Sequence, residues 1–169
     1  MNAVSPLADS SSSSPLILVI EGDDGDYEAI YHSLRHSPTE TRLHRCTTGK
    51  QALKYLERSF QQISIHPNLI PRLILLALNL PEIDGWYVLE VIKQDPLFKY
   101  IPIIILIIPD DLGTVEECYR LGANSCLIKI IDFYQFRKTI LTTVKFWLEI
   151  AVIPNFSRAA KSKPDGSNY

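Results

Sequence analysis

The sequence predicts an α/β fold, a three-layer doubly wound five-stranded parallel sheet with helices on both faces. Short apolar runs alternate with segments of helical period, which is typical of parallel strands joined by crossover helices. The run 103–108, IIILII, is apolar at every position, as expected of a central strand covered on both sides. The chain has 169 residues, of which 46% are hydrophobic, and this suffices for one domain with a sizeable core.

Five apolar runs are the expected strands, and the segments between and after them are the five expected helices. The strands span 16–20, 41–46, 73–78, 103–108 and 124–128. The apolar residues that share a helical face are Tyr27, Ile30 and Leu34; Ala52, Leu53, Leu56 and Phe60; Val88, Leu89 and Ile92; and Leu112, Val115 and Leu121.

Residues suited to helix ends agree with this division. Asp84, and Asp110 or Asp111, are plausible N-caps, because their side chains can accept hydrogen bonds from free backbone N–H groups. Gly122 follows a helical stripe, where a left-handed residue is needed.

The last helix carries more apolar surface than one buried face requires. The stripe expected to pack on the sheet is Phe133, Phe136, Ile140, Val144 and Trp147 or Leu148. Surplus apolar surface often contacts a partner, so we expect an interface here, with packing in the core as the alternative. The interface candidates are Leu141, Phe146, Trp147 and Ile150, and a homodimer through this helix is one possible assembly.

The two ends of the chain differ in composition from the middle. Residues 1–15 are rich in serine and cannot bury enough apolar surface to order themselves, so we expect a disordered leader. Residues 154–169 are rich in Ser, Lys, Pro, Gly and Asn and are expected to form a flexible tail. The expected domain is 16–153.

Composition and charge exclude several classes of function. A net charge of -2 disfavours direct binding to nucleic acid or to an anionic membrane surface. No apolar run reaches the ~18 residues of a membrane span and no signal peptide is present, so we expect a cytoplasmic protein. Cys46, Cys118 and Cys126 lack disulfide or zinc spacing and are expected to be reduced, buried thiols, with a redox role for Cys118 or Cys126 as the alternative.

Ligands of a doubly wound sheet bind beyond the carboxyl ends of its strands. Four stretches lie there: 21–26, 77–84, 107–111 and 129–132. They contain no Ser/His/Asp set and no glycine-rich phosphate loop, so an enzyme is not expected.

These stretches resemble the CheY-like response-regulator receiver family over almost the whole predicted domain, most closely the stand-alone regulators that partner cyanobacterial phytochromes. The matching segments are 17–21, 73–85, 101–102 and 121–125, then Lys129 with 132–136, and 147–148 with Pro154. The resemblance implies a flavodoxin-like sheet of strand order 2-1-3-4-5 and a role in two-component phosphorelay signal transduction. It also implies partners of three kinds: a histidine kinase, a phytochrome-like sensor or another regulator.

The same resemblance shows which reactive groups this chain lacks. Phosphorylation of an aspartate needs a carboxylate nucleophile, a Mg²⁺ with oxygen ligands, and donors to the phosphoryl oxygens. The family's nucleophile falls on Ala77, one of its metal carboxylates on Gly22, its switch hydroxyl on Ile107 and its switch aromatic on Cys126. The retained pocket residues are Glu21, Asn79 and Lys129.

We therefore expect a pseudo-receiver that acts as a phosphorylation-independent adaptor, with weak or absent Mg²⁺ binding. Small and apolar replacements should leave the former pocket drier and better packed. Two alternatives remain open. One is a sensor that binds a small anion between Glu21, Ala77 and Lys129, and the other is a receiver phosphorylated through a non-standard site.

The charged residues near the predicted pocket also have two interpretations each. Asp23, Asp24 and Asp26 form either a rebuilt metal site or a solvated turn with a helix N-cap. Lys129 either binds an anion or pairs with Glu21.

Overall fold

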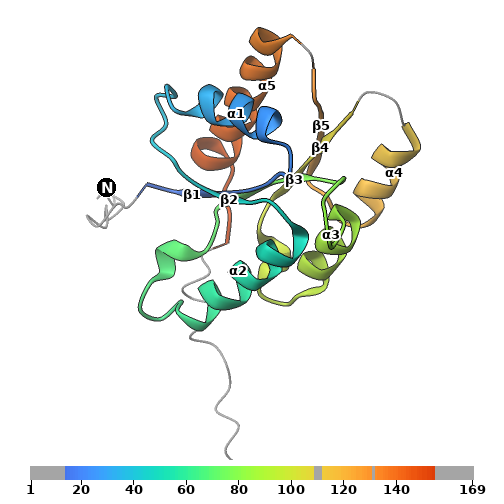
Figure 1. The fold of residues 1–169 in the computed structure, drawn as a ribbon. Helices are drawn as coiled ribbons and strands as arrows, with labels where there is room; N and C mark the ends of the chain where they lie inside the picture. Colours follow the sequence, from blue (N-terminus) through green and yellow to red (C-terminus); the bar gives the residue numbers. More distant parts are fainter. Residues whose placement is uncertain (1–13, 109–111, 131, 155–169) are drawn as a thin grey trace, which may run out of the picture.

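The structure, a computed structural model, describes residues 14–108, 112–130 and 132–154, and it contains one five-stranded parallel sheet (Figure 1). The strand order is β2-β1-β3-β4-β5, so the predicted doubly wound, three-layer fold and its order are confirmed. The strands are β1 (Leu16–Ile20), β2 (Arg42–Cys46), β3 (Leu73–Ala77), β4 (Ile103–Ile107) and β5 (Ser125–Ile128). Four of the five differ from the predicted runs by one residue at one end.

The α-helices are α1 (Asp24–Leu34), α2 (Gly49–Gln61), α3 (Gly85–Gln94), α4 (Leu112–Arg120) and α5 (Phe133–Lys145). Three short turns of helix complete the described chain: η1 (Pro67–Leu69), η2 (Phe98–Tyr100) and the π-helical η3 (Phe146–Ile150). No helix within these described ranges is both long enough and apolar enough to cross a membrane.

Successive side chains of the central strands point to opposite faces of the sheet and are buried in two separate cores, one on each face. Leu18 and Ile20 of β1 pack with α2, α3 and α4, whereas Ile17 and Val19 pack with α1 and α5. Figure 1 shows α1 and α5 above the sheet and α2 and α3 below it. Every residue of β1, β3 and β4 is buried, which explains why these runs show no polar alternation.

Helix ends follow the predicted chemistry where they can be compared. Asp84 caps α3 by accepting a hydrogen bond from the Tyr87 N–H at 2.9 Å. Gly122 follows α4 with φ of +97°, the left-handed conformation that glycine adopts without strain. Asp110 and Asp111 lie outside the described residues.

The stripe of the last helix begins one turn later than predicted. Phe136, Ile140 and Val144 are buried, but Phe133 is 49% exposed, so its assignment to the packed face is wrong. Phe133 is the first residue of α5, where the helix has only just left the end of β5 and does not yet cover the sheet. Trp147 and Leu148 are partly buried against the same core.

The predicted chain ends lie almost wholly outside the described residues. At the boundary, Ser14 and Pro15 had been assigned to the leader, but their carbonyl oxygens accept hydrogen bonds from the Nε and backbone N–H of Arg42, both at 2.9 Å. These bonds hold Ser14 and Pro15 against β2.

Candidate functional site

The carboxyl ends of β1, β3, β4 and β5 surround a pocket of about 610 Å³. Its lining includes six of the seven residues that the sequence singled out: Glu21, Gly22, Ala77, Asn79, Ile107 and Lys129. The four predicted strand-end stretches therefore do meet. The expectation of a well-packed former pocket is wrong, because small side chains such as Ala77 do not fill the space between the surrounding loops.

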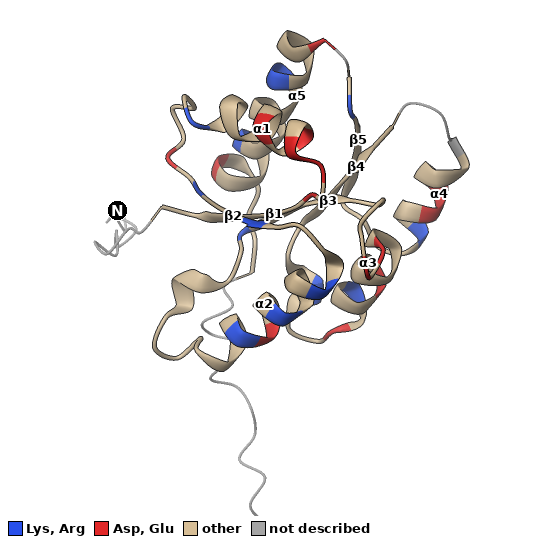
Figure 2. Ribbon diagram, viewed as in Figure 1, with Lys and Arg blue, Asp and Glu red and all other residues tan. Residues whose placement is uncertain are grey.

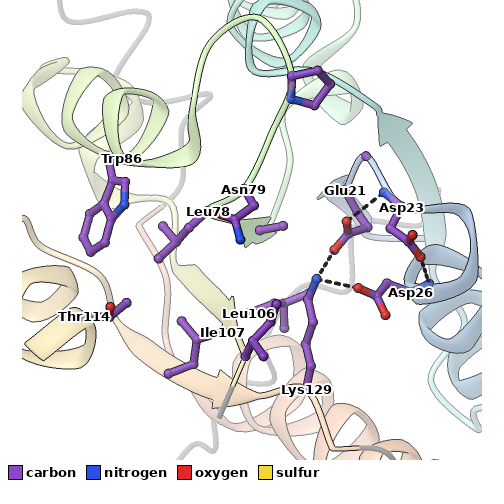
Figure 3. Close-up of a pocket in the computed structure, with 14 residues that line it drawn as sticks. Glu21, Asp23, Asp26, Leu78, Asn79, Trp86, Leu106, Ile107, Thr114 and Lys129 are labelled. Carbon is purple, nitrogen blue, oxygen red and sulfur yellow. Dashed lines mark hydrogen bonds and ion pairs between the residues drawn. The ribbon is translucent and has the colours of Figure 1, made fainter. Parts of the chain in front are cut away.

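One side of the pocket is an acidic wall made of Glu21, Asp23 and Asp26, from the end of β1 and the start of α1 (Figure 3). Lys129 Nζ, from the end of β5, lies 2.8 Å from Glu21 Oε2 and 2.6 Å from Asp26 Oδ2. The predicted pair between Lys129 and Glu21 is thus present. The second bond, to Asp26, was not predicted.

The environment of Lys129 favours its charged form. Burial acts to lower the pKa of Lys129, but its hydrogen bonds to Asp26 and Glu21 and the charges of these two carboxylates raise it above its ordinary value. Glu21 is only 1% exposed, and its Oε1 accepts a hydrogen bond from the Asp23 N–H at 2.9 Å. Both oxygens of the buried carboxylate are therefore satisfied within the protein.

One carboxylate of the acidic wall caps a helix. Asp23 Oδ1 accepts the Asp26 N–H at 2.8 Å as the N-cap of α1, which is the capping role considered for this loop. Mg²⁺ and related ions need several converging oxygen ligands. In the described part of the chain, no group of three or more His, Cys, Asp or Glu side chains is placed to hold a metal ion.

Arg45 of β2 fixes the backbone of the same loop. Its Nε donates to the Glu21 carbonyl at 3.1 Å and its Nη2 to the Gly22 carbonyl at 3.3 Å, while Nη1 lies 2.8 Å from Asp24 Oδ1. The guanidinium also lies 4.5 Å from the centre of the Tyr27 ring. Sequence reasoning missed this residue, because an arginine in a half-exposed strand gives no signal of which loop it contacts.

The pocket is also lined by an apolar wall, made of Ala77, Leu78, Trp86, Leu106 and Ile107. Figure 3 shows Leu78, Trp86 and Ile107 across the pocket from the acidic wall. Ala77 ends β3 with 2% exposure and pairs in register with Leu106 of β4. Ile107, 7% exposed, ends β4. None of these five residues carries a carboxylate or hydroxyl group, and the hydroxyl group on this side of the pocket is that of Thr114 of α4 (Figure 3).

Gly22 and Asn79 mark two edges of the pocket. A β-carbon at Gly22 would stand 3.2 Å from Pro81 Cδ and 3.2 Å from the Thr47 carbonyl oxygen. Both contacts are tight, so a side chain at this position requires Pro81 or the Thr47 carbonyl to move by a few tenths of an ångström. Asn79 is exposed and its side chain borders the pocket (Figure 3).

Cys126 does not line the pocket. It lies in β5, opposite Ile105 of β4, and packs partly buried against the core that also contains Cys118. All three cysteines are free, and burial raises the pKa of Cys46 to about 11 and that of Cys118 to about 12. Cys46 and Cys118 match the expectation of buried thiols, whereas Cys126 is only partly buried.

The four interface candidates divide into two pairs. Phe146 is 46% and Ile150 64% exposed, so both are available at the surface. Leu141 and Trp147 are partly buried and pack against the core under α1 and α5. The surface beyond the last helix is therefore carried by Phe146 and Ile150, together with the fully exposed Val152.

Comparison with curated proteins finds relatives among response regulators. The chain is 32% identical to the response regulator Rcp1 of Synechocystis sp. over 88% of this chain and 99% of that protein. It is 28% identical to the probable methanogenesis regulatory protein FilR2 of Methanothrix harundinacea, over 79% of this chain and 83% of the relative.

Solved structures give the same result. The phosphorylated cyanobacterial phytochrome response regulator RcpA matches with a TM-score of 0.73 and 30% identity, over 84% of this chain and 99% of that one. The Mn(2+)-bound form of Rcp1 matches with a TM-score of 0.72 and 32% identity, over 83% and 99%. The profile of the response regulator receiver domain matches residues 17–141. The chain therefore belongs to the response regulator receiver domain family, whose fold it shares.

Proposed function

We propose that this receiver, a component of two-component signalling, acts as a phosphorylation-independent adaptor. The observation that carries the proposal is that Ala77 lies in the pocket together with a Lys129 that already contacts two carboxylates. Ala77 stands at the end of β3, facing the pocket, and has no oxygen that could attack a phosphoryl group. Lys129, the cation that could neutralise such a group, already contacts two carboxylates.

The remaining carboxylates of the pocket do not replace the missing groups. Glu21 is held by Lys129 and by the Asp23 N–H, and Asp23 caps α1. Phosphoryl transfer depends on positioning and on neutralising the charge that develops on the phosphoryl oxygens. Since the acidic wall adds negative charge and its carboxylates are already engaged, we propose that Mg²⁺ binds weakly or not at all.

The relatives suggest the kind of partner. RcpA is a cyanobacterial phytochrome response regulator, and a third solved relative, 25% identical, belongs to red light signalling in R. palustris. We therefore propose a histidine kinase, a phytochrome-like sensor or another regulator as the partner, with the cytoplasm as the place of contact. A homodimer through Phe146 and Ile150 is the proposed use of the surface at the last helix.

Mass spectrometry of the intact chain tests phosphorylation independence. The protein is incubated with Mg²⁺ and acetyl phosphate, and separately with a phosphorylated histidine kinase, beside a receiver that carries the usual aspartate. We expect no gain of a phosphoryl group in this chain and a clear gain in the control. A stable phosphoryl group on any residue would refute the proposal, and mapping it to Asp23 or Asp26 would establish the non-standard site instead.

Light scattering coupled to size exclusion tests the dimer. If the last helix forms it, Phe146→Ser with Ile150→Ser should give a monomer, while Tyr134→Ser, which changes an exposed aromatic residue at the start of α5, should leave the dimer intact. A wild-type chain that is monomeric at high concentration would exclude this assembly.

Binding of a small anion is a second candidate, favoured only by the volume of the pocket. The charge of the pocket disfavours anion binding, because three carboxylates and one lysine line the pocket. Calorimetry with inorganic phosphate and small carboxylates, on wild type and Lys129→Ala, decides the matter. Saturable binding lost in the variant would favour the sensor.

A further inference from the structure

The amine of Lys93 lies among three neutral oxygen atoms. Lys93 is in the last turn of α3 and is partly buried. Its Nζ donates to the carbonyl oxygens of Lys99 at 3.2 Å and Ile101 at 2.9 Å, and to Asn124 Oδ1 at 2.8 Å. Its stem packs on the turn after α4, where a β-carbon at Gly122 would lie 3.3 Å from Lys93 Cγ. One side chain therefore joins the end of α3 to the segment before β4 and to the turn before β5.

No carboxylate forms an ion pair with this amine within the described ranges. The other charged residues of α3, η2 and α4, and of the segment between α3 and η2, are Glu90, Asp95, Lys99, Glu116, Glu117 and Arg120. Glu90 Oε1 accepts from Gln94 Nε2 at 3.0 Å, and Asp95 Oδ1 accepts two backbone N–H groups of the turn that follows it. Glu117 pairs with Arg120. These three carboxylates are thus engaged away from Lys93.

Burial without a counter-charge favours the neutral amine. It lowers the pKa of Lys93 to about 8. Lys129 is the opposite case, because two carboxylates contact it and its pKa is raised. The residues that accept two of the three hydrogen bonds of Lys93, Lys99 and Asn124, are exposed. A desolvated neutral amine at the surface has a lone pair with which it can attack an electrophile.

We infer that Lys93 is an acylation site, at which the amine takes an acyl group from a small acyl phosphate. The Nζ lone pair attacks the carbonyl carbon of the acyl phosphate and forms a C–N bond. The bond between that carbon and the phosphate oxygen breaks, and phosphate leaves with the electron pair and takes up the proton that the nitrogen loses. The products are one amide and one hydrogen phosphate ion. No residue of the pocket takes part, so the inference does not rest on the proposed adaptor function.

Acylation would remove most of the contacts that the amine makes. The amide nitrogen carries one N–H group and no charge, so at most one of the three hydrogen bonds remains. Asn124 still accepts the Ile103 N–H at 3.0 Å, which holds the turn before β5 to β4. The expected product is a chain in which the end of α3 and η2 are held less tightly against an intact sheet.

Incubation of the full chain with acetyl phosphate tests the site. Digestion and mass spectrometry of timed samples give the rate of acetylation at each lysine. At about pH 7.5, roughly a quarter of Lys93 is neutral, against roughly a thousandth of an amine with the ordinary pKa of 10.5. We expect Lys93 to be acetylated at least about tenfold faster than Lys129, which is paired, and Lys54, which is exposed.

A pH profile and one variant separate the chemistry of the amine from its exposure. The rate at Lys93 should level off above a pH of about 8, where the amine is already neutral, while the rate at Lys54 should keep rising. Asn124→Asp keeps the acceptor oxygen for Lys93 and the Ile103 N–H but places a negative charge beside the amine. This charge favours the ammonium form, so acetylation of Lys93 should slow by about tenfold.

The inference fails if Lys93 is acetylated no faster than Lys129, if its rate keeps rising with pH as at Lys54, or if Asn124→Asp leaves the rate unchanged. Should Asn124→Asp unfold the protein, the first two measurements on the wild type still decide the matter. Hydrogen exchange reports the consequence, because the amides of η2 must exchange faster in the acetylated chain. Lys93→Arg, which keeps the positive charge and cannot be acetylated in this way, is the matched control and should show no such change after the same incubation.

Discussion

The acidic wall of the pocket is held by charges that pair with each other, whereas the apolar wall opposite is held by close packing. Lys129 and Arg45 together contact Glu21, Asp24 and Asp26 or their backbone. Figure 2 shows acidic residues as red segments at the start of α1. The apolar wall has no such groups. Phosphoryl transfer would need polar groups on both walls. Because one wall is apolar, the chain can have the fold of a receiver without the groups that its chemistry requires.

The packing of the apolar wall should be the most sensitive to change. A β-carbon at Gly85 would lie 2.3 Å from the Ala77 carbonyl oxygen and 2.6 Å from Leu78 Cα, both backbone atoms that cannot move alone. We expect Gly85→Ala to lower the free energy of unfolding by about 3 kcal/mol or more, measured by urea denaturation. Gly25→Ala, which meets only the Asp23 side chain in the exposed first turn of α1, should change it by less than about 1 kcal/mol. Equal losses of stability in Gly85→Ala and Gly25→Ala would show that the apolar wall is not more sensitive to packing than the acidic wall.

Removing Lys129, which pairs with two carboxylates of the acidic wall, should have the next largest effect on stability. Lys129→Met leaves the buried Glu21 and the nearby Asp26 without their shared cation. The expected loss is about 3 kcal/mol, because an uncompensated buried charge costs more than the pair contributes. Combining the variant with Glu21→Gln should recover part of the loss, and failure to recover any would point to lost packing of the lysine stem instead.

The pH dependence gives an independent check on this pair. The folded-state pKa of Lys129 is raised above its ordinary value of 10.5, so the stabilisation is complete below that value and is lost as the pH rises through the folded-state pKa. The difference in stability between wild type and Lys129→Met should therefore shrink only in strongly alkaline solution. A difference that disappears near neutral pH would contradict the assignment.

Arg45, which contacts the backbone of the loop that carries the acidic wall, should contribute less to stability than Lys129. Arg45→Met removes two hydrogen bonds to backbone carbonyls and the contact with Tyr27, and we expect a loss of about 1–2 kcal/mol. Arg120→Met, which breaks the exposed pair with Glu117 on α4, is the matched control and should cause no measurable loss. If Arg45→Met and Arg120→Met show the same change in thermal unfolding temperature, Arg45 does not stabilise the loop at Glu21 and Gly22.

Restoring one group to the apolar wall should have no effect on phosphorylation. Ala77→Asp supplies a nucleophile, but Gly22 and Ile107 would still lack a metal ligand and a hydroxyl group. We expect no phosphoryl group on this variant after incubation with acetyl phosphate and Mg²⁺. Robust phosphorylation of the single variant would show that positions 22 and 107 matter less than the comparison of the two walls suggests.

The fold was predictable because its signals are local. The unbroken apolar runs of β1, β3 and β4 reflect burial on both faces, and Asp84 caps its helix through a neighbour three residues away. Strand ends determine which loops meet, so the contact between Lys129 and Glu21 could also be anticipated.

Contacts that depend on the orientation of one turn could not be predicted in the same way. The bond from Lys129 to Asp26 depends on how the first turn of α1 leaves the sheet, and Arg45 reaches the loop only because β2 lies beside β1. The open pocket could not be predicted, because its volume depends on the positions of the segments that contain Pro81 and Trp86. The residue types in these segments do not determine those positions.

The bonds of Lys129 also say something about the order in which the molecule assembles. Lys129 is 108 residues from Glu21 and 103 from Asp26 along the chain. Contacts of such long sequence separation form late, because the entropy of closing the intervening loop must be lost first. During synthesis from the N-terminus, β1 and α1 are made long before β5, so Glu21 and Asp26 do not yet have Lys129 to contact, although Asp24 can already pair with Arg45. Docking of the last strand therefore completes the sheet and neutralises the buried carboxylate of Glu21 in a single step. A nascent chain that stops before β5 keeps Glu21 without Lys129, and chaperones or proteases could distinguish such a chain from the finished protein.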